Sequence, residues 1–142
     1  MVLCAGLACK KTIIENGDKQ IRFDFSPVAT TGQTWITYGS LNIYKFNIDY
    51  YKGVDSVFLS VWAYVPKAGN KGTIELYNIT DSVPIPGSLI EVNASPEPIL
   101  YQSSNIQKNL PHKEITLGLR LNGEMSGQLV EFNKSSLYLY RK

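Results

Sequence analysis

Hydrophobic and polar residues alternate with a period of two along most of the chain, as in β-strands that bury one face. The longest such segment spans residues 54–65, where every second position from Val57 onward is aliphatic and the positions between carry Phe58, Trp62 and Tyr64. No segment has a convincing helical period, and residues 102–110 could hold one helical turn at most. The pattern predicts further strands at residues 21–25, 34–38, 41–51, 72–78, 88–92, 99–103, 114–121, 128–132 and 136–140.

Turn-forming residues separate the predicted strands and indicate the fold class. The dipeptide Asn122-Gly123 is typical of a hairpin turn, and clusters rich in Pro, Gly and Asn mark several other turns. About ten short strands with such turns are typical of an all-β fold, a two-sheet antiparallel β-sandwich with jelly-roll topology. No internal repeat or shift in composition divides the chain. We therefore expect a single β-sandwich domain at residues 20–142, preceded by an N-terminal segment at residues 1–19.

Each well-patterned strand has one aliphatic face and one face that carries aromatic and polar residues. Arg120 alternates with the aliphatic set of residues 115–121, and Tyr138 alternates with Leu137 and Leu139. Aromatic rings stack on the apolar faces of sugars, while Arg, Glu and Thr side chains hydrogen-bond to sugar hydroxyls. The alternative is that these aromatics only stabilise cross-strand pairs or lie under a loop or a neighbouring subunit. The residues expected to form one ligand-binding surface are Phe58, Trp62, Tyr64, Glu75, Tyr77, Arg120 and Tyr138.

The composition narrows the range of partners. The 142 residues, 44% of them hydrophobic, suffice for one sizeable core. Fourteen basic and twelve acidic residues give a net charge of +2, which is too balanced for a nucleic-acid-binding surface. Only 18% of the residues are charged, whereas nine are tyrosine and two are tryptophan, so the surface suits a carbohydrate or another protein subunit. No apolar run approaches the roughly 20 residues that cross a bilayer.

Residues for nucleophilic or metal-dependent catalysis do not form a recognisable motif. His112 is the only histidine, and the chain has no G-x-S-x-G, phosphate-binding or dinucleotide-binding motif. Cys4, Cys9 and one distant histidine cannot form a standard zinc site. These residues therefore give no support to a hydrolase triad or a zinc enzyme.

Paired carboxylates are the remaining route to catalysis, because glycosidases use two acidic residues that flank the bond they cleave. Glu75 is on the polar face of its strand, and Glu114 or Glu131 could lie near it. Nothing in the sequence sets their separation, and an acidic residue in an exposed strand is usually only solvated. We therefore predict a protein that is not an enzyme and that has no cofactor.

Both cysteines lie near the N-terminus, where the sequence has features of an export signal. A short apolar run ends at Cys9 and is followed by two lysines, which resembles the end of a bacterial lipoprotein signal with Cys9 as the lipidated residue. Leu7 lies two places before Cys9 rather than three, and a basic leader is missing. The alternatives are a first β-strand with two buried thiols and a Cys4–Cys9 disulfide in an exported protein. The membrane would be contacted only through the lipid anchor.

Three segments resemble a known family. They are residues 53–64 (GVDSVFLSVWAY), residues 72–81 (GTIELYNITD) and residues 86–88 (PGS). Together with the last strand they are similar to the carbohydrate-binding-module-like, galactose-binding-like jelly-roll β-sandwiches of bacterial surface proteins and phage virion proteins. The resemblance covers roughly residues 43–140. Residues 80–82 supply polar side chains suited to a turn, so we interpret that part of the motif as structural rather than as a site.

The resemblance implies two kinds of function. One is a non-catalytic carbohydrate-binding module on a secreted or surface-anchored protein, located outside the cytoplasm. The alternative is a structural or decoration protein of a virion or appendage that uses the same sandwich for protein–protein contacts. Members of this group often carry a structural calcium ion. No metal site can be assigned here, because Asp49, Asp55, Asp81 and Glu91 do not form a spaced acidic motif.

Overall fold

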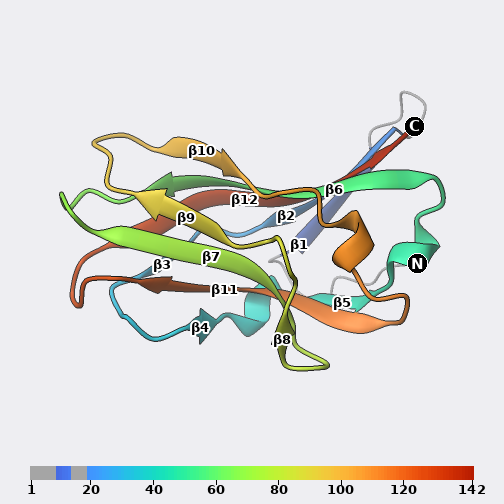
Figure 1. Cartoon of the computed structure of the whole chain (residues 1–142), viewed down its shortest axis with the longest axis horizontal. Coiled ribbons are helices and arrows are strands. Elements are labelled where there is room, and N and C mark those ends of the chain that lie inside the picture. The colour runs from blue at the N-terminus through green and yellow to red at the C-terminus, as the bar shows by residue number, and fades with distance from the viewer. Residues whose placement is uncertain (1–8, 14–18) are drawn as a thin grey trace.

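The computed structural model describes residues 9–13 and 19–142, which form two antiparallel sheets packed face to face (Figure 1). Sheet A has the order β1-β2-β12-β6-β10, with β3 also paired to β12. Its strands are β1 (Cys9–Ile13), β2 (Gln20–Phe25), β3 (Val28–Thr30), β6 (Val54–Tyr64), β10 (Ile99–Gln102) and β12 (Val130–Arg141). Sheet B has the order β4-β11-β7-β8, with β5 also paired to β11 and β9 to β7. Its strands are β4 (Ile36–Thr37), β5 (Ile43–Phe46), β7 (Lys71–Asn78), β8 (Val83–Pro84), β9 (Ile90–Asn93) and β11 (Ile115–Gly123).

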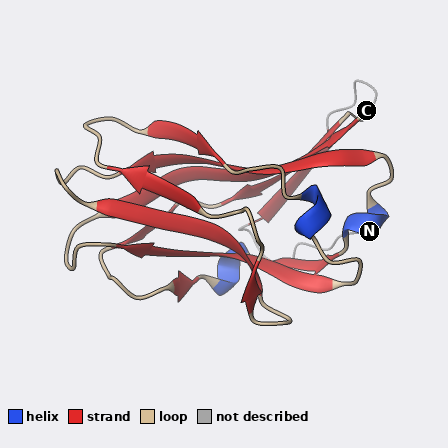
Figure 2. Ribbon diagram, in the orientation of Figure 1, coloured by secondary structure: helices blue, strands red, loops and turns tan. Residues whose placement is uncertain are grey.

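The long strands alternate between the two sheets, as in a jelly roll. β6 of sheet A is followed by β7 of sheet B, and β11 of sheet B is followed by β12 of sheet A. Figure 2 shows strands throughout both layers and only single helical turns, at Gly39–Leu41, Ile48–Tyr50 and Gln107–Asn109. No helix in the described part of the chain is long and apolar enough to cross a membrane. The predicted all-β sandwich is confirmed.

The inner faces of the sheets meet in one core. At one end of the core, the rings of Phe23, Phe46 and Tyr51 pack with centroids 5.8 to 6.1 Å apart, in edge-to-face and stacked arrangements that add to hydrophobic burial. The aliphatic sets predicted from the alternation are all buried, as expected. They are Val57, Leu59, Val61, Ala63 and Val65 in sheet A and Ile115, Leu117, Leu119 and Leu121 in sheet B.

The strand predicted over residues 41–51 is shorter in the structure. β5 ends at Phe46, and residues 48–50 form a helical turn. The Asn47 side chain accepts a hydrogen bond from the Asp49 N–H at 3.0 Å and caps this turn. Phe46 and Ile48 are both buried, so the alternation that suggested a longer strand is kept although the backbone leaves the sheet.

The two strands predicted at residues 128–132 and 136–140 are one continuous strand, β12. The register with β6 pairs Phe132 with Ala63 but Lys134 with Trp62, so Asn133 is an extra residue in a β-bulge. The side chains that face the core are even-numbered up to Phe132 and odd-numbered from residue 135 onward. The extra residue of the bulge accounts for this change in the phase of the alternation. That change in phase is what made one strand look like two.

The hairpin predicted at Asn122-Gly123 is wrong. Both residues lie inside β11, and the chain then crosses to sheet A through residues 124–129. Gly123 lies at a close contact between the two sheets rather than in a turn. It pairs with Gly72 of β7, and a Cβ at Gly123 would lie 3.3 Å from Val130 Cγ2.

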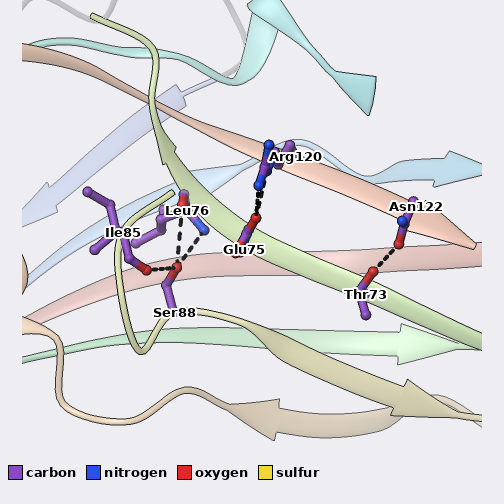
Figure 3. Close-up of polar contacts among 7 residues, drawn as sticks. All are labelled: Thr73, Glu75, Leu76, Ile85, Ser88, Arg120 and Asn122. Atoms are coloured by element: carbon purple, nitrogen blue, oxygen red, sulfur yellow. Dashed lines mark hydrogen bonds and ion pairs between the residues drawn. The ribbon is translucent and has the colours of Figure 1, made fainter. Parts of the chain in front are cut away.

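Side-chain oxygens continue the strand ladders where the short edge strands end. On β7, the Ser88 hydroxyl accepts from the Leu76 N–H at 3.0 Å and donates to the Ile85 carbonyl at 2.7 Å (Figure 3). On β6, the Ser103 hydroxyl accepts from the Leu59 N–H at 2.9 Å. Ser88 and Ser103 are buried, so these hydroxyls satisfy backbone groups that water cannot reach.

Replacing Ser88 with alanine is expected to lower the free energy of unfolding by about 1–3 kcal/mol, because the buried Leu76 N–H loses its acceptor. Urea denaturation measures the change. The exposed Ser126→Ala is the control and should alter stability by less than about 0.5 kcal/mol. Equal effects of the two substitutions would contradict the role given to Ser88.

Gly72 lies where the two sheets approach closely. A Cβ at this position would lie 2.3 Å from Val130 Cγ1 and 3.1 Å from Val92 Cγ2. Val130 belongs to the opposite sheet, so any side chain at residue 72 would push the sheets apart.

Gly72→Ala is therefore expected to destabilise the fold by about 1–3 kcal/mol through overpacking. Gly39→Ala is a matched control, because a Cβ there meets nothing within 4 Å. Thermal unfolding of the two variants distinguishes them. A melting temperature for Gly72→Ala as high as that of Gly39→Ala would show that the sheets have room to separate.

Candidate functional site

The residues predicted to form one surface lie on both outer faces of the sandwich. β6 and β7 are consecutive in the chain but belong to different sheets, so their outward side chains point in opposite directions. The prediction of a single surface is therefore wrong, while the binding role of its residues stays a prediction. Phe58, Trp62, Tyr64 and Tyr138 are on sheet A, and Glu75, Tyr77 and Arg120 are on sheet B.

On sheet B, the outward side chains gather around Arg120. The Arg120 Nη2 and Nε atoms lie 2.5 Å and 2.6 Å from Glu75 Oε1 across the β7–β11 pair (Figure 3). The guanidinium carbon lies 4.5 Å from the ring centroid of Trp35 and 4.4 Å from that of Tyr77. We call these four residues, from three separate segments of the chain, the Arg120 cluster.

The Arg120 cluster is held together by both charge and shape. Glu75 is only 6% exposed, and a buried carboxylate of this kind is stable only with a charged or hydrogen-bonding partner. The planar guanidinium of Arg120 also contacts two aromatic rings, an arrangement that a lysine ammonium would not reproduce. The cluster therefore restrains the ring of Trp35, which is itself 37% exposed.

A hollow of about 380 Å³ lies beside the exposed edge of this cluster. Thr73 donates a hydrogen bond to the Asn122 side-chain oxygen across the strand pair, which leaves the Asn122 amide N–H groups available to a ligand (Figure 3). The residues that line the hollow and could contact a ligand include Trp35, Leu89, Thr73, Asn122, Glu91 and Lys71. The hollow thus combines an aromatic ring, an aliphatic side chain and several polar groups.

Trp35 was not among the predicted site residues, although residues 34–38 were predicted as a strand. Only Ile36–Thr37 form β4, which pairs with β11 so that Thr37 lies opposite Arg120. The contact between Trp35 and Arg120 depends on this pairing of distant segments. No local pattern in the sequence indicates it.

The carboxylates considered for catalysis do not form an acid pair. Glu75 is neutralised by Arg120 on sheet B, whereas Glu131 is on β12 of sheet A. Glu114 precedes β11 by one residue, about 20 Å along the strand from Arg120. It accepts a hydrogen bond from Tyr50, which raises the pKa of Tyr50. Glycosidases need two carboxyl groups about 5–10 Å apart, and these three do not provide them.

Polar residues at one end of the sandwich stabilise loops. His112 Nδ1 lies 2.7 Å from Asp49 Oδ1 on the exposed surface. In the turn after β7, Asp81 interacts with Lys113 and with Asn78, and these hydrogen bonds lower the pKa of Asp81. The interpretation of residues 80–82 as a structural turn agrees with these contacts. Within residues 9–13 and 19–142, no group of three or more His, Cys, Asp or Glu side chains is placed so that it could hold a metal ion.

The chain resembles known proteins in its fold but not in its sequence. No protein-family model matches the chain, and no curated protein matches its sequence. The structure is similar to the infectious bursal disease virus VP2 subviral particle, with a TM-score of 0.52 and 11% identity over 87% of this chain and 34% of that one. It is also similar to the xylan-binding module CBM15, with a TM-score of 0.48 and 6% identity over 97% of this chain and 88% of that one. A further match is the carbohydrate-binding module CBM6cm-2 of Cellvibrio mixtus lichenase 5A, with a TM-score of 0.45 and 10% identity over 96% of this chain and 88% of that one.

At such low identities the likeness concerns the fold alone. A jelly-roll sandwich hosts many unrelated roles, so the function has to be argued from the side chains of its outer faces. The strand order therefore makes the chain a jelly-roll β-sandwich, and its architecture is similar to that of the viral particle protein.

Proposed function

We propose that this domain is a non-catalytic carbohydrate-binding module and that the hollow beside Trp35 holds a neutral sugar. The main support for this proposal is the position of Trp35. Its ring lies on the Arg120 guanidinium and also lines a hollow of about 380 Å³, within the size range of small-molecule sites. Thr73 and Asn122 supply hydrogen-bonding groups on the same wall.

A restrained aromatic ring suits a sugar for physical reasons. The apolar face of a sugar ring gains by leaving water, while its hydroxyl groups must exchange water for other hydrogen-bond partners. A side chain already fixed before binding loses little conformational entropy when the ligand arrives. Glu75 and Tyr77 would act as positioning residues, because they hold Arg120 and through it Trp35.

The alternative, a structural protein of a virion or appendage, is supported by exposed apolar side chains. Leu89, which directly precedes β9 of sheet B, is exposed, as are Ile99 and Leu100 of the edge strand β10 in sheet A. All three could be buried against another subunit. Light scattering separates the two functions. A monomer at high concentration supports the binding module, and concentration-dependent self-association supports the assembly protein.

We further propose that the domain works outside the cytoplasm, as a secreted or surface-anchored protein. Lipidation at Cys9 is one way to anchor it, and a sugar-binding domain meets polysaccharides at the cell surface. Mass spectrometry of the protein from its native membrane fraction tests the anchor. An acylated Cys9 is the expected result, and an unmodified peptide that contains Cys9 would rule the anchor out.

Trp35→Ala is expected to weaken binding of a neutral oligosaccharide at least about tenfold, because the stacking platform is lost. Calorimetry with cellohexaose, xylohexaose and mannohexaose measures the effect. Tyr44→Ala is a matched control, since Tyr44 is an equally exposed aromatic (37%) on β5 of the same sheet. No binding by the native protein to any neutral oligosaccharide, or equal losses in the two variants, would contradict the proposal.

Arg120→Lys is expected to keep the charge pair with Glu75 but to lose the planar stacking on Trp35 and Tyr77. Binding should weaken about three- to tenfold, because the ring of Trp35 must then be ordered by the ligand. NMR relaxation of the Trp35 indole N–H in the free protein, which is resolved from that of Trp62, should show a more mobile ring. Unchanged affinity together with a more mobile Trp35 would show that restraint of the ring does not matter.

A further inference from the structure

The outer face of sheet A has a hollow of its own, of about 240 Å³, across its central strands. Its floor is a row of short polar side chains. Ser60 of β6 lies opposite Ser136 of β12 and opposite Gln102 of β10, and Ser136 in turn lies opposite Asp24 of β2. We call this hollow the serine trough.

The floor of the serine trough is long and hydrogen-bonded. The Ser136 hydroxyl donates to Asp24 Oδ1 at 2.6 Å, and the Gln102 amide donates to the Ser60 hydroxyl at 3.4 Å. Within the hollow the row crosses three adjacent strands, β10, β6 and β12, and with about 4.8 Å between strands it extends for about 10 Å. The row runs perpendicular to the strands, and its length suits an extended ligand of several units rather than a ligand with a single ring.

One wall of the trough is formed around Trp62. Two residues beyond Ser60 on β6, Trp62 lies between Lys134 of β12 and Leu100 of β10. The Trp62 side chain is 42% exposed and Leu100 is 52% exposed. This wall therefore offers an open aromatic ring next to an aliphatic and a cationic side chain.

The opposite wall is aromatic. Two residues before Ser60, Phe58 lies opposite Tyr138. The Tyr138 and Tyr140 rings stack with centroids 6.0 Å apart, and Phe58 packs edge-on against Tyr140 at 6.1 Å. Trp62 lies four positions after Phe58 on β6, which places the two walls about 13 Å apart at the backbone.

The charged side chains around the trough indicate which charge a ligand should carry. Arg22 binds Asp24 at 3.0 Å, so this pair is neutral overall. Lys134 is exposed and makes no ion pair with any described residue, and Glu131 lies one row further out, opposite Tyr64. Among the residues that line the hollow and that the structure describes, Lys134 is thus the one charged side chain. The hollow on sheet B differs, since Lys71 there is accompanied by Glu91 and Glu124.

We propose that the serine trough is a second ligand site, separate from the hollow beside Trp35, and that it binds an acidic polysaccharide. Sugar rings would stack on Trp62 and Tyr138, hydroxyl groups would contact the polar floor, and Lys134 would bind a carboxylate or sulfate group of the chain. A protein partner fits less well, because the centre of a protein–protein interface is apolar, whereas the centre of this trough is a row of hydroxyl and amide groups.

The two hollows lie on opposite outer faces, so one domain could hold two polysaccharide chains of different charge at once. The serine trough does not depend on the neutral-sugar site. Loss of one site by substitution leaves the other in place, and a failure of either proposal is therefore recognisable on its own.

Calorimetry with oligogalacturonate, a sulfated carrageenan oligosaccharide and cellohexaose tests the second site. The native protein should bind at least one of the two anionic probes, and the one that binds identifies the anionic group that Lys134 contacts. Trp62→Ala should weaken that binding about tenfold or more, and Trp35→Ala should leave it unchanged. Binding of neither anionic probe, or a loss caused by Trp35→Ala instead of Trp62→Ala, would overturn the proposal.

A charge-matched pair of variants tests the role of Lys134. Lys134→Gln should weaken binding of the anionic probe about two- to fivefold, as expected for an exposed ion pair, and should not change any binding of cellohexaose. Lys67→Gln removes the same charge from the exposed turn after β6 and is the control. Equal losses in both variants would show that net charge rather than the trough attracts the probe. Thermal melts of all variants verify that they fold.

Discussion

Burial of one set of side chains between the two sheets determines which residues face outward on both of them. Because side chains alternate along a strand, burying Val57, Leu59 and Val61 forces Phe58, Ser60 and Trp62 outward. The same rule places Glu75, Tyr77 and Arg120 outside sheet B. Both outer faces therefore carry aromatic and charged residues as a direct consequence of the way the core is built.

The two faces accommodate these outward residues differently. On sheet B, Arg120 binds Glu75 and lies between Trp35 and Tyr77, so the polar and aromatic groups satisfy one another. On sheet A, short serines separate the rows of large rings, so the rings remain accessible along a trough. The cluster on sheet B therefore suits a ligand that stacks on one restrained ring. The trough on sheet A suits an extended polysaccharide chain.

The sequence was sufficient to predict the strands, the fold class and the inner and outer positions, because these follow from a local alternation. It was not sufficient to predict which strands are neighbours, since pairing joins segments far apart in the chain. For that reason the alternation alone predicts Trp62 and Arg120 on one surface, and it gives no sign of the contact between Trp35 and Arg120. The extra residue Asn133 and the close approach at Gly72 also depend on the partner strand rather than on local pattern.

The chain has two tryptophans, one on each outer face, which provides a direct measurement of where a ligand binds. The central claim is that a neutral oligosaccharide occupies the face of Trp35. In an NMR titration with such an oligosaccharide, the indole N–H signal of Trp35 is expected to shift while that of Trp62 stays in place. A shift of the Trp62 signal alone, or no shift of either signal at saturating ligand, would contradict it.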